Sequence, residues 1–203
     1  MTTELIEQIK KDGEAVVLHI GCGMDSRIER TGVKENQWFD IDFESVIIER
    51  KKHYRETDYY HMIVGDASKP EWVTALPKNA DVIVILEGIS MYLKINDIEN
   101  LLRTINNHFN NVNLLIDCYT ELSAKMSKYK NPVNDVGVTQ VFGIDNPELV
   151  VDSNVLFKKE HEMIPAKCIE ELDGLEKFIF RKLYAGNLSK KLYKLYEFEK
   201  SLN

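Results

Sequence analysis

Residues 16–27 read VVLHIGCGMDSR, an apolar run that stops at two closely spaced glycines and then becomes polar. This pattern is typical of a buried strand that leads into a ligand-binding loop. Glycine tolerates positive φ and lets backbone N–H groups approach a ligand that a β-carbon would push away. Because a lone G-x-G is also compatible with an ordinary tight turn, the loop indicates a binding site only in combination with residues further along the chain.

A second apolar run, WFDID at residues 38–42, ends in an acidic residue. A carboxylate at such a strand end can accept hydrogen bonds from both hydroxyls of a ribose. We expect this role for Asp42, and a structural or supporting role for Asp40 on the same strand. The two runs together predict a cofactor that contains adenosine.

The spacing of the glycines narrows the choice of cofactor. A dinucleotide fingerprint needs G-x-G-x-x-G, so that a helix N-terminus can approach the pyrophosphate, whereas this loop continues with Ser26 and Arg27. S-adenosylmethionine contains no phosphate and fits the loop better. A nicotinamide-dependent dehydrogenase is kept as an alternative.

Size and composition predict one globular domain over residues 1–203, since 44% of the residues are hydrophobic and 29% are charged. No apolar run is long enough to span a bilayer and no signal peptide is recognisable, so we expect a cytoplasmic protein without a membrane partner. The net charge of −7 opposes binding to nucleic acid. The few cysteines, Cys22, Cys118 and Cys168, and the irregular histidine spacing predict free thiols and no metal site.

Short apolar segments at residues 15–20, 36–42, 61–66, 81–87 and 113–119 predict strands, and helical spacing between them predicts helices. One helix should start at Asn96, with Glu99 three residues on. The alternation indicates an α/β fold with a doubly wound, mostly parallel sheet. Beyond it we expect strands at 155–157 and 178–180, a helix at 166–172, a last helix that carries Tyr193 and Tyr196, and an irregular excursion over 128–147.

Three segments carry a resemblance to a known family: LHIGCGMDSR at residues 18–27, WFDIDF at 38–43 and LEGISMYL at 86–93. They resemble leucine carboxyl methyltransferases, above all the bacterial branch grouped with tetracenomycin-type polyketide O-methyltransferases. The resemblance implies a seven-stranded Rossmann-like methyltransferase sheet with helices on both faces. It also implies transfer of a methyl group from S-adenosylmethionine to a carboxylate or hydroxyl oxygen of a small-molecule acceptor.

The resemblance assigns a place to individual residues around that cofactor. Gly21 and Gly23 would lie under its methionyl part, Asp42 would bind the ribose, and Tyr92 could face the methyl-transfer centre. Asp66 and Ala67 would flank the adenine, and Glu87 would lie beside the cofactor. The full set of cofactor-binding candidates comprises Gly21, Cys22, Gly23, Arg27, Asp42, Phe43, Asp66, Ala67, Glu87 and Gly88.

Several of these residues have a second interpretation. Arg27 could provide the cation for the cofactor carboxylate or form a surface ion pair. Asp66 could cap a turn through Ser68. Glu87 follows an apolar run, where a buried acid is costly without partners, which argues for a ligand or a hydrogen-bond network. His161, at the end of a late strand, could be a general base.

The start of the chain motivates an alternative function. Relatives carry a helical region before the first strand that supplies a basic residue to the cofactor carboxylate, whereas residues 1–13 alone precede it here. With a shortened N-terminal region, the chain could be a cofactor-binding module of the same fold, with little turnover, that acts through protein partners. A homodimer whose second subunit supplies the missing cation is also possible.

Overall fold

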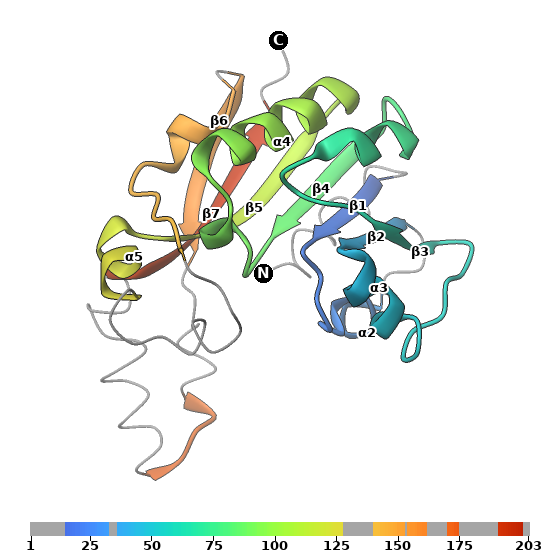
Figure 1. Ribbon diagram of the computed structural model, residues 1–203, viewed down its shortest axis with the longest axis horizontal. Coiled ribbons are helices and arrows are strands. Elements are labelled where there is room, and N and C mark those ends of the chain that lie inside the picture. The colour runs from blue at the N-terminus through green and yellow to red at the C-terminus, as the bar shows by residue number, and fades with distance from the viewer. Residues whose placement is uncertain are drawn as a thin grey trace.

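The structure, a computed structural model, describes residues 15–32, 36–127, 140–152, 154–161, 170–174 and 191–200. Its strands form one seven-stranded sheet in the order β3-β2-β1-β4-β5-β7-β6 (Figure 1). All pairs from β3 to β5 are parallel, and β7 runs antiparallel to both of its neighbours. This confirms the predicted α/β class and the mostly parallel sheet. The strands are β1 (Ala15–Ile20), β2 (Gln37–Asp42), β3 (Tyr60–Val64), β4 (Asp81–Leu86), β5 (Val112–Tyr119), β6 (Val155–His161) and β7 (Tyr193–Lys200).

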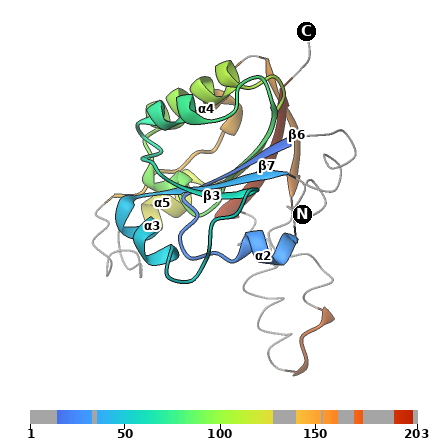
Figure 2. The ribbon, with the colours of Figure 1, turned by 90° about the vertical axis from the view of Figure 1, so that its right-hand side faces the viewer.

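Helices cover both faces of the sheet, which explains why its central strands are apolar throughout (Figure 2). In β1, Val16 and Leu18 pack into the core beneath α4 (Ile95–His108), and Val17 packs into the opposite core. That second core contains Ile28 of α2 (Arg27–Thr31) and Ile47 of α3 (Glu44–Arg50). The remaining helical elements are α5 (Glu121–Ser127) and the 3-10 turns η1 (Pro70–Ala75), η2 (Ser90–Tyr92) and η3 (Pro147–Val150).

The last described element corrects a sequence expectation, because Tyr193 and Tyr196 lie on strand β7 and not on a helix. Charged residues of β7 form ion pairs across to β6. Lys194 Nζ lies 3.1 Å from Glu160, and Glu197 lies 3.3 Å from Lys158 Nζ. Opposite charges paired across neighbouring strands in this way stabilise their pairing.

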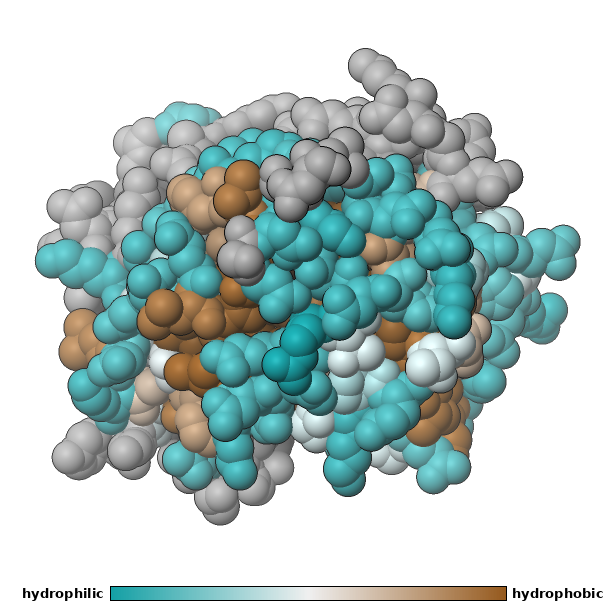
Figure 3. All heavy atoms as spheres, turned by 90° about the horizontal axis from the view of Figure 1, so that it is seen from above, coloured by the Kyte–Doolittle hydropathy of each residue, from teal (hydrophilic) through white to brown (hydrophobic). Residues whose placement is uncertain are grey.

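The start of α4 is a second correction. The helix begins at Ile95 with Lys94 as the N-cap residue, and no side chain caps it. Asn96 and Glu99 therefore form no capping box. Most polar residues of α4 are exposed or half-buried, although Asn106 is buried, and the view from above shows mostly hydrophilic residues with apolar ones in between (Figure 3).

Other expectations hold in part or fall outside the described ranges. The first five strands agree with prediction to within one or two residues at each end, and the strand expected at 155–157 continues to His161. The strand expected at 178–180, most of the helix at 166–172 and the excursion over 128–139 lie outside the described residues, whereas residues 140–146 are irregular as expected. Among the described helices, none combines the length and apolar character needed to cross a membrane.

Candidate functional site

The candidate site lies at the carboxyl ends of β1 and β4. These neighbouring strands mark the point where the order of the sheet reverses, and ligands of doubly wound sheets bind at that point. The loop after β1 contains Gly21 and Gly23, and the segment after β4 contains Glu87 and Gly88. The sequence motifs of the two loops therefore come together in space.

The glycine loop needs both of its glycines, because φ is +70° at Gly21 and +51° at Gly23. Gly23 is fixed on both sides: its N–H donates to Asp42 Oδ2 at 2.8 Å, and its carbonyl accepts from Arg50 Nη1 at 2.9 Å. Asp42 also accepts from the N–H of Phe43 at 2.7 Å. The carboxylate predicted to bind the ribose thus ends β2 directly beside the glycine loop.

The segment after β4 packs directly on this loop. A β-carbon built on Gly21 would come within 2.1 Å of Cγ2 of Ile89. Gly88, between Glu87 and Ile89, has a φ of +81°. Close approach and backbone conformation together require glycine at Gly21, and the two halves of the site are in van der Waals contact through Ile89.

Beneath the glycine loop lies a buried polar network around Asp40. Its carboxylate accepts from Trp38 Nε1 at 2.8 Å, from the Tyr60 hydroxyl at 2.6 Å and from Arg50 Nε at 2.8 Å, and His19 Nδ1 lies 3.2 Å away. Burial acts to raise the pKa of Asp40, but the contact with His19 and the charge of Arg50 outweigh it, so the pKa is lowered. Asp40 is therefore the structural residue expected, and it orients the guanidinium that holds Gly23.

Arg27 and Glu87 form an ion pair across the crevice. Arg27 Nη2 donates to Glu87 Oε2 at 2.5 Å and lies 3.1 Å from Asp25. The side chain of Glu87 is 42% exposed, so it is not the buried acid that the apolar run suggested, because β4 ends one residue before it. Arg27 thus forms the ion pair that one interpretation expected, but it is 8% exposed and so does not lie at the surface, and its Nη1 has no hydrogen-bond partner among the described residues.

Asp117 of β5 is a fully buried acid beside this pair that the sequence analysis did not single out. Its Oδ2 accepts from the N–H of Gly88 at 2.5 Å and from the hydroxyl of Tyr193, and Ser90 Oγ lies 3.4 Å from its Oδ1. Burial raises the pKa of Asp117 to about 6, with the nearby charge of Glu87 acting in the same direction and the hydrogen bonds opposing it.

The other cofactor-binding candidates lie around the same strand ends. Asp66 follows β3 and caps a turn, as one interpretation proposed: its Oδ1 accepts from both the N–H and the hydroxyl of Ser68. Ala67 packs against the core, and Phe43 is 59% exposed after β2. The side chain of Cys22 is buried, and burial raises its pKa, so only its backbone belongs to the loop.

The two candidates for the catalytic step lie in different places. Tyr92 follows β4, is 41% exposed, and has its pKa raised by burial and by the proximity of Tyr119 and Asp117. His161 ends β6, and its Nε2 lies 2.6 Å from Glu197 Oε2. Four strand spacings, roughly 19 Å, separate β6 from β1, so His161 is not brought together with the glycine loop.

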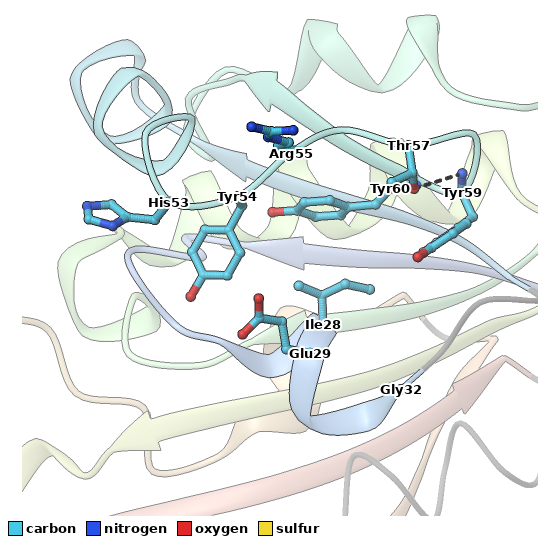
Figure 4. Close-up of a pocket in the computed structure, with 9 residues that line it drawn as sticks. All are labelled: Ile28, Glu29, Gly32, His53, Tyr54, Arg55, Thr57, Tyr59 and Tyr60. Atoms are coloured by element: carbon cyan, nitrogen blue, oxygen red, sulfur yellow. Dashed lines mark hydrogen bonds between the residues drawn. The ribbon is translucent and has the colours of Figure 1, made fainter.

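A pocket of about 240 Å³ lies away from these strand ends, between α2 and the segment before β3 (Figure 4). Its lining includes the rings of Tyr54, Tyr59 and Tyr60 and the carboxylate of Glu29. Tyr54 packs over Arg50, with the guanidinium carbon 4.4 Å from the ring centroid. A second cavity, of about 360 Å³, lies at the opposite edge of the sheet, where Ala15 and Gln37 begin their strands. Apart from Tyr60, which also donates to Asp40, neither cavity is lined by a residue described above for the site.

The leucine carboxyl methyltransferase family model matches residues 2–106, and these contain the glycine loop, Asp42 and the segment after β4. The chain belongs to the leucine carboxyl methyltransferase family. It is 30% identical over 169 residues to the tetracenomycin polyketide synthesis O-methyltransferase TcmP of Streptomyces glaucescens, covering 82% of this chain and 63% of that protein. These findings confirm the family that the motifs indicated.

Two further comparisons agree. The chain is 28% identical over 152 residues to the S-adenosyl-L-methionine-dependent methyltransferase dpfgK of Gibberella zeae, covering 68% of this chain and 51% of that protein. It therefore spans less than two thirds of the length of either relative. The structure also superposes on the magnesium protoporphyrin IX methyltransferase ChlM of Synechocystis PCC 6803, solved with bound SAH. That match has a TM-score of 0.61, 10% identity, and coverage of 98% of this chain and 80% of that one, and it supports the fold.

Three residues at the site were not predicted from the sequence, and they differ in whether a sequence pattern could have indicated them. Asp117 interrupts the apolar run of β5 near its end, much as Glu87 follows the apolar run of β4. The argument used for Glu87, that an acid in an apolar run is costly to bury without partners, could therefore have identified Asp117. Arg50 carried no such signal, because a basic residue in the last turn of a helix is ordinarily solvent-exposed. Tyr193 was hidden by the expectation of a helix.

Proposed function

We propose that this protein is an S-adenosylmethionine-dependent O-methyltransferase that acts on a carboxylate or hydroxyl oxygen of a small-molecule acceptor. The observation that carries the proposal is the meeting of the glycine loop, Asp42 and the Arg27–Glu87 pair at the reversal point of the sheet. Family membership and the O-methyltransferase TcmP as a relative support the reaction type.

The residues present suit such a cofactor. Arg27 Nη1 is a buried guanidinium nitrogen without a hydrogen-bond partner among the described residues, which is the donor that a cofactor carboxylate needs. Glu87 is half-exposed in the crevice and could accept from a ligand ammonium group. Gly21 and Gly23 have no β-carbons, so the loop backbone leaves room for a ligand in the crevice. Asp42 could accept hydrogen bonds from the ribose hydroxyls if these replaced its hydrogen bond from the Gly23 N–H. Asp66 and Ala67, after β3, would lie beside the adenine.

Catalysis by this chain would consist mainly of alignment. The bound cofactor supplies a sulfonium methyl group that an acceptor oxygen can attack in line. The glycine loop and Asp42 would fix one side, and Tyr92 would orient the acceptor from the segment after β4. Holding two reactants in place can contribute ~7–11 kcal/mol, whereas general-base help contributes about 10²–10⁴-fold, so an ionised acceptor needs no base. His161 would act as a base only if the acceptor reached across β5 and β7.

The test is calorimetric titration of S-adenosylhomocysteine into the protein and into Asp42→Ala. Losing charged hydrogen bonds to the ribose should weaken binding about 10–100-fold. Asp81→Ala, at the other end of β4, is the matched control and should bind as the unmodified protein does. If Asp42→Ala binds S-adenosylhomocysteine with unchanged affinity, Asp42 does not bind the ribose.

A methyl-release assay separates an enzyme from a binding module. Phenolic and carboxylic acceptors are offered with labelled S-adenosylmethionine, and turnover of either class supports the proposed activity. Tight cofactor binding without transfer to any acceptor would contradict it.

The proposal also covers the cellular compartment, the class of acceptor and the oligomeric state. We expect the protein to work in the reducing cytoplasm, on the grounds that Cys22 and Cys118 are free and buried. The acidic charge balance argues against nucleic acid as the acceptor and supports a small molecule. Light scattering would test whether the protein forms a homodimer.

A further inference from the structure

Two acids lie next to each other at the site. Leu86 of β4 pairs with Ile116 of β5, so the next residue along each strand is an acid, Glu87 on one and Asp117 on the other. The negative charge of Glu87 acts on Asp117 across this gap. Like charges placed side by side repel each other unless a cation lies nearby.

The hydrogen bonds of Asp117 do not explain why it carries a charge. The Gly88 N–H and the Tyr193 hydroxyl both donate to Oδ2, and an amide carbonyl oxygen in that position could accept both. Ser90 Oγ lies 3.4 Å from Oδ1 and donates to the backbone carbonyl of Asp117, so an amide nitrogen there could donate to the hydroxyl. An asparagine would therefore satisfy the same neighbours without burying a charge.

The fold keeps this charge although it is costly. Asp117 is 0% exposed, and burial makes its ionised form less favourable than that of an ordinary carboxyl group, as its raised pKa indicates. Arg27 has its Nη2 on Glu87 and Asp25, and Arg50 is held by Asp40 and the Gly23 carbonyl, so no contact among the described residues joins either cation to Asp117. A positively charged ligand would account for the arrangement.

We propose that the buried carboxylate of Asp117, together with Glu87, selects the positively charged sulfonium form of the cofactor over its neutral thioether product. This inference rests on the proposed function. Methyl transfer removes the positive charge, because the methyl carbon bonds to the acceptor oxygen and the electron pair of the broken C–S bond stays on sulfur. The same carboxylates that favour the substrate form would then favour release of S-adenosylhomocysteine.

The test compares two ligands in Asp117→Asn, which keeps the shape and the hydrogen bonds and removes the charge. Calorimetry gives the dissociation constants of S-adenosylmethionine and S-adenosylhomocysteine. The preference for S-adenosylmethionine should fall about tenfold or more, as expected for unit charges within about 10 Å at an effective dielectric constant near 20. Affinity for S-adenosylhomocysteine should be nearly unchanged, and Asp81→Asn should leave both values unchanged.

The outcomes separate the possibilities. If the unmodified protein binds neither ligand, the proposed function fails. If it binds both and Asp117→Asn weakens both equally, the charge of Asp117 does not distinguish the two ligands and the inference is wrong. An unchanged preference overturns it as well.

A second measurement covers the case in which Asp117→Asn does not fold. In the unmodified protein, the preference for S-adenosylmethionine should decrease as the pH falls below about 6, where Asp117 gains a proton. The titratable groups around Asp117 among the described residues are Glu87, Tyr92, Cys118, Tyr119 and Tyr193. Phenols and thiols ordinarily titrate above about pH 8, so Glu87→Gln is the variant that isolates Asp117. If Glu87→Gln abolishes the pH dependence, the effect belongs to Glu87 and not to Asp117.

Discussion

Replacing Gly21 and Gly23 separately by alanine should have unequal effects, although both residues have positive φ. A left-handed conformation costs an alanine ~1–2 kcal/mol relative to glycine. At Gly23 no atom lies within 4 Å of the added β-carbon, so this is the whole cost expected there. At Gly21 the added carbon meets Ile89 Cγ2 at 2.1 Å, and forcing a branched side chain out of place costs a further ~1–3 kcal/mol.

The free energy of unfolding, measured by urea denaturation, should therefore fall by about 2–5 kcal/mol for Gly21→Ala and by about 1–2 kcal/mol for Gly23→Ala. A double-mutant cycle with Ile89→Ala isolates the contact, since the truncated side chain leaves only a β-carbon 3.1 Å away. In that background Gly21→Ala should cost little more than Gly23→Ala, giving a coupling of about 1–3 kcal/mol. Equal costs for the two single variants, or a coupling below about 0.5 kcal/mol, would refute the packing of the two loops against each other.

Two other perturbations test the buried charges. Arg50→Met leaves the buried carboxylate of Asp40 without its ion-pair partner and should lower the free energy of unfolding by about 3–5 kcal/mol. The control Arg30→Met removes an exposed pair with Asp25 and should change it by less than about 1 kcal/mol. Similar losses for the two variants in urea denaturation would contradict the structure. Asp117 binds its proton more tightly in the folded chain, with a pKa of about 6 against an ordinary 3.8, so its contribution to stability is full below about pH 4 and is lost as the pH rises from about 4 through about 6. Asp117→Asn should therefore gain up to about 3 kcal/mol on the unmodified protein between pH 4 and pH 7.5, and a difference in unfolding free energy that does not vary with pH would show that Asp117 is not buried as described.

The sequence predicts the parallel part of the sheet well because burial on both faces leaves a simple signal. The run Val82–Leu86 is apolar at each position since alternate residues enter different cores, and none of the described helices has an uninterrupted apolar run of this kind. The end of the chain lacks such a signal. In β7 the ion-pair partners of Lys194 and Glu197 lie on β6. No pattern in the sequence near Lys194 or Glu197 indicates those partners.

The residues of the candidate site likewise divide into those that local sequence patterns predict and those that only tertiary packing brings to the site. Gly21, Gly23, Asp42 and Glu87 belong to local patterns at strand ends, so their proximity follows from a parallel sheet. Arg50 and Tyr193 take part only because α3 and β7 bring them to Gly23 and Asp117. Contacts of this kind depend on tertiary packing, which local spacing does not encode.

The support of Gly23 from two sides has a consequence for protein engineering. Its N–H is held from the end of β2 and its carbonyl from the end of α3, so the shape of the first loop depends on residues well downstream of it. A chimera that exchanged the glycine loop alone with that of a relative would separate it from both supports. The smallest transplantable unit therefore runs from β1 through α3, and recombination within that stretch should yield proteins that fold but bind their ligand poorly.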